Sequence, residues 1–295
     1  IPEALSSIVT IVQAMGTQKM AKENAIIKDL KAVESLGCVS VICSDKTGTL
    51  TQNKMTVQQV YFDGRETGIN ELKSPNSVAQ YLLYGAVLAN DAVFTDGKMI
   101  GDPTEFALLE MAERLGINEN TMREELPRLG ELPFDSDRKL MSTKHKIYGV
   151  PTLLTKGAVD VLLPRAARIM TVKGARAMSE SDRMKIMEQN MEFSRKGLRV
   201  LAFAFRTLEE EAPLNVEMET DYTFIGLISM MDPPRVESKT AVANAVRAGI
   251  KPIMITGDHK VTASAIAEKI GIFREHDMAV TGTELDAMDE KELRE

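Results

Sequence analysis

Short apolar runs and segments of helical character alternate along this chain, and their order predicts a mixed α/β fold. The apolar runs predict strands at 39–43, 60–62, 151–155, 198–204, 223–231 and 252–255. Helices are expected at 77–90, 105–115, 236–248 and 261–270. Strand and helix follow each other near both ends of the chain, whereas the middle mixes strands and helices less regularly. The pattern therefore predicts two differently built parts.

The first strand leads directly into a turn that carries charged and hydroxyl side chains. Val39, Val41 and Cys43 alternate as in a short, buried parallel strand, and Asp45 stands at its end before a Thr-Gly-Thr turn. Ligands of open α/β sheets bind at this end of a strand. A carboxylate beside Lys46 and a turn rich in backbone N–H groups suits attack on a phosphoryl group. The simpler alternative is a solvated Asp-Lys turn.

A second turn of the same kind follows the last predicted strand. Thr256, Gly257 and Asp258 come directly after residues 252–255, just as Asp45 follows the first strand. A Thr-Gly-Asp sequence by itself is a common turn. Its position at a strand end adds it to the candidate phosphoryl site.

Composition bounds the possible functions. The 295 residues suffice for about two domains, and 44% hydrophobic residues suffice for a buried core. A net charge of −7, the absence of Trp and the lack of a long basic run argue against a nucleic-acid surface. Cys38 and Cys43 fit no CxxC pattern, so buried thiols in a reducing cytosol are expected. No stretch reaches the roughly 20 apolar residues of a membrane span.

The seven residues from Asp45 to Thr51 resemble the phosphorylation signature of the P-type ATPases. The resemblance implies that Asp45 takes the γ-phosphoryl group of ATP, with Lys46 and a Mg²⁺ ion at Asp45 and Thr47 neutralising charge. Related soluble phosphatases of the haloacid dehalogenase superfamily have a second Asp where this chain has Thr47. Without that acid/base, water attack is slow and an aspartyl-phosphate persists, as a pump requires. Thr256, Gly257 and Asp258 resemble the superfamily's second motif, which holds the phosphoryl oxygens.

The middle of the chain resembles the nucleotide-binding domain of the same family. The residues that the resemblance assigns to ATP are Glu105, Phe134, Lys139, Lys156, Gly157 and Arg199. Three simpler interpretations apply where the residues are considered alone: Asp102 caps the helix that contains Glu105, Phe134 belongs to the core, and Lys156 is a surface charge. Ser136 replaces an Arg that some calcium pumps carry, which leaves that phosphate contact in doubt.

The resemblance also implies a domain organisation. A haloacid-dehalogenase-like, Rossmann-type phosphorylation domain is split between residues 18–53 and 231–295, with an inserted α+β nucleotide-binding domain at 54–230. The hinges are expected near Asn53 and at Asp232–Arg235, where two prolines fix the backbone. Asp232 and Arg235 are included among the expected nucleotide contacts.

The first 17 residues resemble the cytoplasmic end of a membrane helix. Pro2 and Glu3 open a variant of the Pro-Glu-Gly-Leu motif that provides an ion ligand in P-type ATPases, which makes Glu3 a candidate ligand of the transported cation. The alternative is an ordinary amphipathic helix with Glu3 as an exposed charge. The chain resembles calcium pumps most, so the expected context is the cytoplasmic face of a cell membrane, with ATP, Mg²⁺ and Ca²⁺ as ligands and the membrane contacted through further helices. Na⁺, K⁺, H⁺ or Mg²⁺ as the transported ion remains an alternative.

Two other classes of function stay open. A soluble phosphotransferase of the same superfamily explains Asp45 but not Thr47, and a regulatory nucleotide-binding module leaves the Asp45 turn unexplained. The later Lys, the Gly-Asp-Gly-x-Asn-Asp turn and the Thr-Gly-Glu-Ser loop of the family do not occur in the sequence. We therefore expect the phosphorylation domain to be C-terminally incomplete, and residues 1–295 to bind nucleotide without turning it over.

Overall fold

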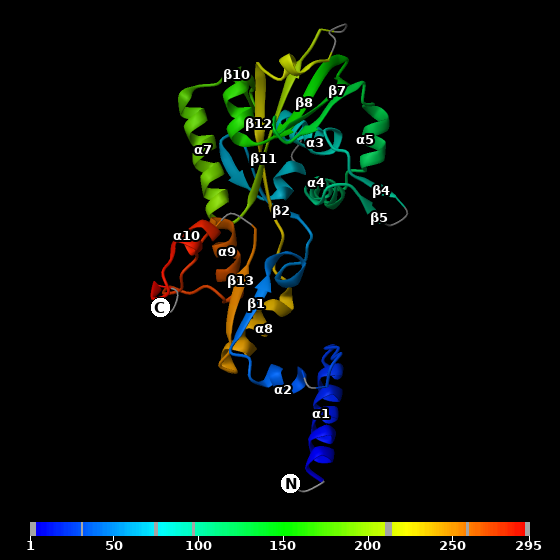
Figure 1. The fold of residues 1–295 in the computed structure, drawn as a ribbon. Coiled ribbons are helices and arrows are strands. Elements are labelled where there is room, and N and C mark those ends of the chain that lie inside the picture. The colour runs from blue at the N-terminus through cyan, green and yellow to red at the C-terminus, as the bar shows by residue number, and fades with distance from the viewer. Residues whose placement is uncertain are drawn as a thin grey trace.

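The computed structural model describes residues 4–30, 32–73, 76–95, 98–209, 214–257 and 260–292. Figure 1 shows a larger body built on a broad sheet and a smaller body below it built on two strands. The chain passes between them twice, once before residue 56 and once after residue 231. Glu3 and Asp258 lie outside the described residues.

The smaller body contains one parallel pair of strands. β1 (Val41–Asp45) pairs in parallel with β13 (Lys251–Ile255), and the helices α8 (Val236–Arg247) and α9 (Lys260–Ile270) pack beside them. A short helix, α10 (Gly282–Ala287), follows. The predicted strands and helices of this part are confirmed to within a few residues.

The prediction that the first strand is buried is wrong. Val41, Ile42 and Cys43 are exposed, and so is Cys38, so neither thiol is buried. Among the described residues, β13 is the only strand that pairs with β1. A parallel strand becomes buried on both faces only where neighbouring strands and helices cover it, and a pair leaves much of its surface open.

The N-terminal part consists of two helices. α1 (Ala4–Lys22) is followed by the short α2 (Ala32–Gly37), which ends at a glycine. The apolar side chains of α1, such as Ile8 and Val12, are exposed. None of the helices in the described ranges is long and apolar enough to cross a membrane.

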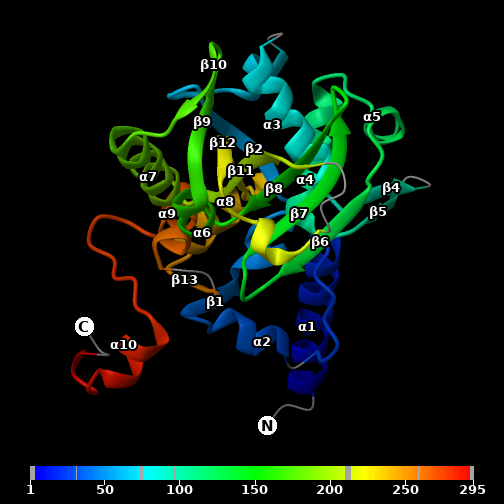
Figure 2. The same cartoon turned by 90° about the horizontal axis from the view of Figure 1, so that it is seen from above.

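Nine described strands form the main sheet of the larger body. They are β2 (Thr56–Phe62), β3 (Arg65–Thr67), β6 (Gly130–Asp135), β7 (Leu140–Ile147), β8 (Val150–Gly157), β9 (Ala166–Thr171), β10 (Gly174–Ala177), β11 (Arg199–Thr207) and β12 (Tyr222–Met231). Their order is β10-β9-β12-β11-β8-β7-β6, while β2 pairs with β12 and β3. All pairs are antiparallel except β9 with β12. Figure 2 shows the curved sheet from above.

Helices cover both faces of this sheet. α3 (Ser77–Leu88), α4 (Pro103–Arg114) and α5 (Glu119–Glu125) lie on one side, and α6 (Val159–Leu162) and α7 (Glu180–Arg195) on the other (Figure 1). β11 illustrates the result, since Phe203 packs into the core under α3 and α4, and Ala202 into the core under α6 and α7. Burial on both faces explains why its sequence is a continuous apolar run. A small hairpin, β4 (Val93–Thr95) with β5 (Lys98–Ile100), extends beside α4.

The fold is therefore mixed α/β with a mostly antiparallel main sheet. Of the expected Rossmann-type sheet, the described residues contain one parallel pair, β1 with β13. Between β11 and β12 the described residues form no helix or strand other than the short 3-10 helix Val216–Met218.

Candidate functional site

Asp45 is the last residue of β1, and its side chain is exposed. The chain then makes one wide turn over Lys46–Leu50, closed by a hydrogen bond from the Thr51 N–H to the Lys46 carbonyl oxygen (3.0 Å). Gly48 has a φ of 75°, which L-residues with a side chain seldom adopt. Thr47 is exposed to solvent, whereas Lys46 is buried. The turn thus leaves a carboxylate and a hydroxyl accessible at the strand end.

The second predicted motif lies at the same edge. In the parallel register of β1 and β13, Asp45 stands opposite Ile255, so Thr256 and Gly257 leave the sheet beside it. Because carboxyl ends of neighbouring parallel strands meet at one edge, two segments 210 positions apart in the sequence form one site. The structure brings together five of the six residues predicted for phosphoryl chemistry, and the sixth, Asp258, lies outside the described residues.

Asp232 and Arg235 make hydrogen bonds to the turn that follows Asp45 and to the residue that ends it. The Asp232 carboxylate accepts hydrogen bonds from the Thr51 hydroxyl (2.5 Å) and from the Lys54 N–H (3.1 Å). Arg235 donates to the carbonyl oxygens of Gly48 (2.9 Å) and Thr51 (3.0 Å). Both residues therefore join the two connections between the bodies, which is the hinge position that the sequence predicts.

Glu105 and Lys156 form an ion pair in the larger body. The Lys156 Nζ lies 2.5 Å from Glu105 Oε1, and the N–H of Asp91 donates to Glu105 Oε2 at 3.1 Å. Lys156 lies near the end of β8 with a side chain only 6% exposed, so the surface-charge alternative is wrong. Asp102 caps α4 by accepting a hydrogen bond from the Thr104 N–H, as predicted.

Burial lowers the pKa of Lys156 below its ordinary value, because the ammonium loses its hydration there. The carboxylate of Glu105 acts in the opposite direction and favours the charged form, without restoring the ordinary pKa. Burial and the neighbouring carboxylate therefore act in opposite directions on the pKa of Lys156, and the effect of burial is the larger.

Phe134, Lys139 and Gly157 gather at the same end of the sheet as Lys156. Asp135 pairs with Leu140, and Leu140 pairs with Gly157, so these strand ends are neighbours. Gly157 is required there, since a Cβ at this position would lie 2.3 Å from the Lys139 carbonyl oxygen. The Phe134 side chain is 62% exposed, and the alternative that it belongs to the core is wrong.

Arg199 begins β11 and is exposed. Its Nη1 donates to the Thr104 hydroxyl at 2.8 Å, which ties it to the first turn of α4 one residue before Glu105. The sheet thus brings together the six residues that the sequence assigns to nucleotide binding in the larger body.

Comparison with known proteins places this arrangement in a family. A family model described as P-type ATPase, cytoplasmic domain N matches residues 79–237. The chain belongs to the P-type ATPase family. It is 49% identical over 298 residues to a calcium-transporting ATPase of Lactococcus lactis, covering 100% of this chain and 34% of the relative.

Two further relatives also match over almost the whole chain. A calcium-transporting ATPase of Listeria monocytogenes is 48% identical, with 99% of this chain and 34% of the relative covered. A cation-transporting ATPase of Synechocystis is 40% identical, with 99% and 35% covered. This P-type ATPase chain therefore spans about a third of the length of these relatives.

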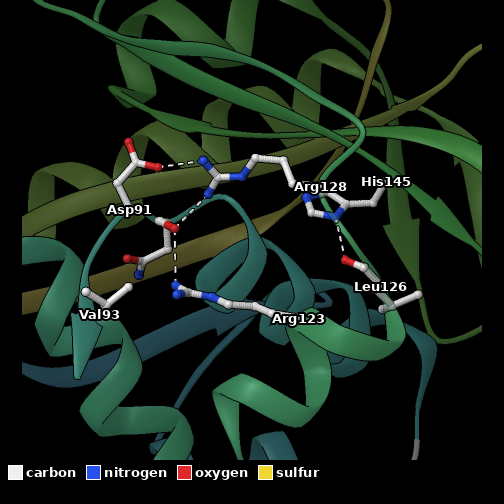
Figure 3. Close-up of a pocket in the computed structure, with 7 residues that line it drawn as sticks. Asp91, Val93, Arg123, Leu126, Arg128 and His145 are labelled. Atoms are coloured by element: carbon white, nitrogen blue, oxygen red, sulfur yellow. Dashed lines mark hydrogen bonds and ion pairs between the residues drawn. The ribbon is translucent and has the colours of Figure 1, made fainter. Parts of the chain in front are cut away.

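A cavity of about 250 Å³ in this P-type ATPase chain is lined by Asp91, Leu126 and His145, among others (Figure 3). Arg123 and Arg128 line it, and both donate to the Asn90 carbonyl oxygen, at 3.2 and 2.8 Å. These cations sit at the C-terminal end of α3, where carbonyl groups lack helical partners, so the cluster is structural. Its link to the predicted site is Asp91, whose carboxylate accepts from Arg128 at 2.7 Å and whose N–H binds Glu105.

Several residues that hold the candidate site residues in place were not predicted from the sequence. Asn90 and Asp91 follow a helix with no motif around them, yet they fix Glu105 through its carbonyl and its carboxylate. Thr104 holds Arg199. Thr51 gives the hinge its hydrogen bond to Asp232, although the sequence marks it only as the end of the signature.

Proposed function

We propose that this chain is the cytoplasmic part of an ATP-driven cation pump of the cell membrane, in which ATP phosphorylates Asp45 and the transported ion is Ca²⁺. The observation that carries the proposal is the register of β1 and β13, which sets Asp45 beside Thr256 and Gly257. The relatives named as calcium-transporting ATPases support the choice of ion. Glu3 is proposed as a ligand of the transported cation.

ATP would bind at the end of the main sheet that carries Glu105, Phe134 and Lys156. The exposed ring of Phe134 offers a face on which adenine stacks, and this explains an aromatic ring left outside the core. Glu105 retains free lone pairs for the adenine amino group, because each carboxylate oxygen accepts more than one hydrogen bond. Lys156 and Gly157 would contact the ribose and phosphates, and Lys139 the base.

Arg199 would reach the phosphates from the edge of the same site, since its side chain is exposed beyond Thr104. Asp232 and Arg235, as hinge residues, would contact the nucleotide when the two bodies approach. Closure of the hinge is required, because Asp45 and the Glu105–Lys156 pair lie on different bodies.

Phosphoryl transfer would then occur at the β1–β13 edge. An oxygen of the Asp45 carboxylate forms a bond to the γ-phosphorus as the bond to the β–γ bridging oxygen breaks, and ADP leaves with that electron pair. Thr256 and Gly257 would hold the transferred oxygens through hydroxyl and N–H groups. Lys46 would neutralise charge. Because Thr47 supplies no acid/base, the aspartyl-phosphate would persist long enough to drive transport.

The oxygens of Asp45 and Thr47 are both exposed and of the hard type that Mg²⁺ prefers, so these residues fit the ion. Mg²⁺ bound there would supply charge neutralisation at the phosphoryl group.

The proposed organisation follows from these roles. Residues 18–53 and 231–295 would form a haloacid-dehalogenase-like phosphorylation domain, residues 54–230 the nucleotide domain, and residues 1–17 the cytoplasmic end of a membrane helix. The test is ATP-dependent ion uptake by the full-length protein in sealed vesicles, with Ca²⁺ compared with Na⁺, K⁺, H⁺ and Mg²⁺. Uptake of Ca²⁺ that is lost in Asp45→Asn supports the proposal, and ATP-driven uptake of another ion alone overturns the choice of Ca²⁺.

A further inference from the structure

Glu219 is a fully buried carboxylate in the segment between β11 and β12, which is rich in acidic residues. It follows the 3-10 helix Val216–Met218, just before β12, and its side chain is 0% exposed. Its Oε1 accepts hydrogen bonds from Arg138 Nη1 and from the Ser142 hydroxyl (2.6 Å). Burying a carboxylate is costly unless a cation and hydrogen bonds compensate, so this group is held where it is by its partners.

Arg138 belongs to the connection between β6 and β7, immediately before Lys139 and four residues after Phe134. Its side chain is only 16% exposed, whereas Phe134 is 62% and Lys139 54% exposed. The connection therefore turns one cation inward, toward Glu219, and presents an aromatic ring and a second cation outward. Ser136, where some relatives are expected to carry an Arg, adds no cation.

Arg138 also makes hydrogen bonds to two residues of β6, the strand before the connection. Its Nη2 donates to the Pro133 carbonyl oxygen at 2.5 Å, and its N–H donates to Asp135 Oδ1 at 2.7 Å. Lys139 adopts a positive φ of 55°, which is uncommon for a residue with a side chain. The Arg138 guanidinium, which binds both Glu219 and the Pro133 carbonyl oxygen, thus holds the backbone of the short β6–β7 connection, which includes Lys139 with its positive φ.

Glu219 has two further partners, Arg165 and Ser142. Arg165, the last residue of the 3-10 helix Leu163–Arg165, places its Nη1 3.9 Å from Glu219 Oε2 and donates to the Glu219 carbonyl oxygen at 3.3 Å. Ser142 of β7 shares a hydrogen bond of 2.8 Å with Thr155 of β8, and Thr155 donates to Tyr222 of β12 at 3.0 Å. Ser142 and Thr155 alternate with Met141 and Lys156, which pair with each other and face the opposite side of the sheet. Glu219 therefore lies behind the nucleotide site and does not touch a nucleotide bound beside Lys156.

We propose that Glu219 is a positioning residue for nucleotide binding, whose ion pair with Arg138 holds the β6–β7 connection in the shape that presents Phe134 and Lys139 to ATP. This inference rests on the proposed function. Without the carboxylate charge, Arg138 loses its anchor and the connection samples shapes in which the ring is not aligned with the base. Part of the free energy of ATP binding is then used to order the connection, so the affinity for ATP is lower.

The test compares variants of the 295-residue chain by titration calorimetry with ATP. Glu219→Gln keeps the size of the side chain and an acceptor for Ser142 but removes the charge that holds Arg138. We expect its Kd for ATP to rise about tenfold, the size of effect that loss of one charged hydrogen bond produces. Glu217→Gln, an exposed carboxylate in the same turn, is the matched control and should leave the Kd unchanged.

A double-mutant cycle distinguishes positioning from a general effect on stability. If Glu219 acts through the connection, Glu219→Gln should change the Kd by less than about threefold once Phe134→Ala has removed the ring. An equal loss of affinity in both backgrounds would overturn the inference. Should Glu219→Gln fold poorly, the double variant Arg138→Met/Glu219→Met removes both charges, a change that buried ion pairs often tolerate, and it must show the same loss.

The outcomes separate this inference from the proposed function. ATP binding by the unaltered chain that Phe134→Ala weakens, together with unchanged binding by both Glu219 variants, overturns the positioning role alone. No ATP binding by the unaltered chain overturns both.

Discussion

The hydroxyl of Thr51 donates a 2.5 Å hydrogen bond to the carboxylate of Asp232, and this bond joins residues 181 positions apart. It links the two segments through which the chain enters and leaves the larger body. The Gln52 N–H strengthens the link by donating to the Pro233 carbonyl oxygen at 3.0 Å. Because Thr51 also ends the turn after Asp45, the connections between the two bodies and the candidate phosphoryl site share one residue.

Thr51→Val tests this link, because valine keeps the shape of threonine and removes the donor. The buried Asp232 carboxylate then loses a charged hydrogen bond, and we expect the free energy of unfolding to fall by about 1.5–3 kcal/mol. Denaturant titration measures the change. Thr49→Val, the same substitution at an exposed position of the same turn, should stay within about 0.5 kcal/mol of the unaltered chain. Equal effects of the two substitutions would show that the link does not stabilise the hinge.

Gly157→Ala should destabilise the end of the main sheet. The added Cβ would lie 2.3 Å from the Lys139 carbonyl oxygen and 2.6 Å from Leu140 Cδ2, and backbone cannot move aside as a flexible side chain does. We expect a loss of about 1–3 kcal/mol in the free energy of unfolding together with weaker ATP binding. Gly68→Ala is the control, since a Cβ there meets no atom within 4 Å. Unchanged stability of Gly157→Ala would refute the close approach.

The strands and helices that the sequence predicts occur in the structure because each carries a local signal, whereas others, such as α7 and β9, were not predicted. β12, for example, is buried at every position, and a continuous apolar run bounded by turns is typical of a strand covered on both faces. The order of the strands in the main sheet has no such signal, because it depends on contacts between distant segments. The burial of β1 was predicted wrongly for a related reason, since an apolar strand is buried only where other elements cover it.

Some residues of the candidate site also carry a local signal in the sequence, and others do not. Asp45, Glu105 and Lys156 stand in recognisable motifs, so they could be predicted. Glu219 could not, because a glutamate in an acidic loop is normally solvated, and only the fold shows that Arg138 lies within reach. Phe134 was ambiguous until its exposure was known.

Phe134→Ala should weaken ATP binding by about 1–3 kcal/mol, the contribution of one base stacked on an aromatic ring. The ring is largely exposed, so the free energy of unfolding should change little. Titration calorimetry and denaturant titration on the same sample measure both quantities. Tyr148→Ala removes another exposed aromatic ring, at the far end of β7, and should leave ATP binding intact. A loss of stability without a loss of affinity would contradict the stacking role.

ATP affinity should depend on the charge of Lys156. The pKa of Lys156 is below its ordinary value, so the ammonium loses its proton at a lower pH than a solvated lysine, and affinity should fall as pH rises through that pKa. Glu105→Gln removes the carboxylate that favours the charged form, so the fall should move to lower pH. Binding is measured in buffers from neutral to alkaline pH. Lys156→Arg stays charged throughout, and an identical pH profile in that variant would exclude Lys156 as the titrating group.

The most direct measurement is to locate the phosphoryl group after the full-length protein reacts with γ-labelled ATP and Mg²⁺. The account predicts an acid-stable, hydroxylamine-labile label on the peptide that contains Asp45, absent from Asp45→Asn, which should still bind ATP. Asp63→Asn, in a turn of the larger body, should keep the label. A label that persists in Asp45→Asn, or that resists hydroxylamine, would contradict the account.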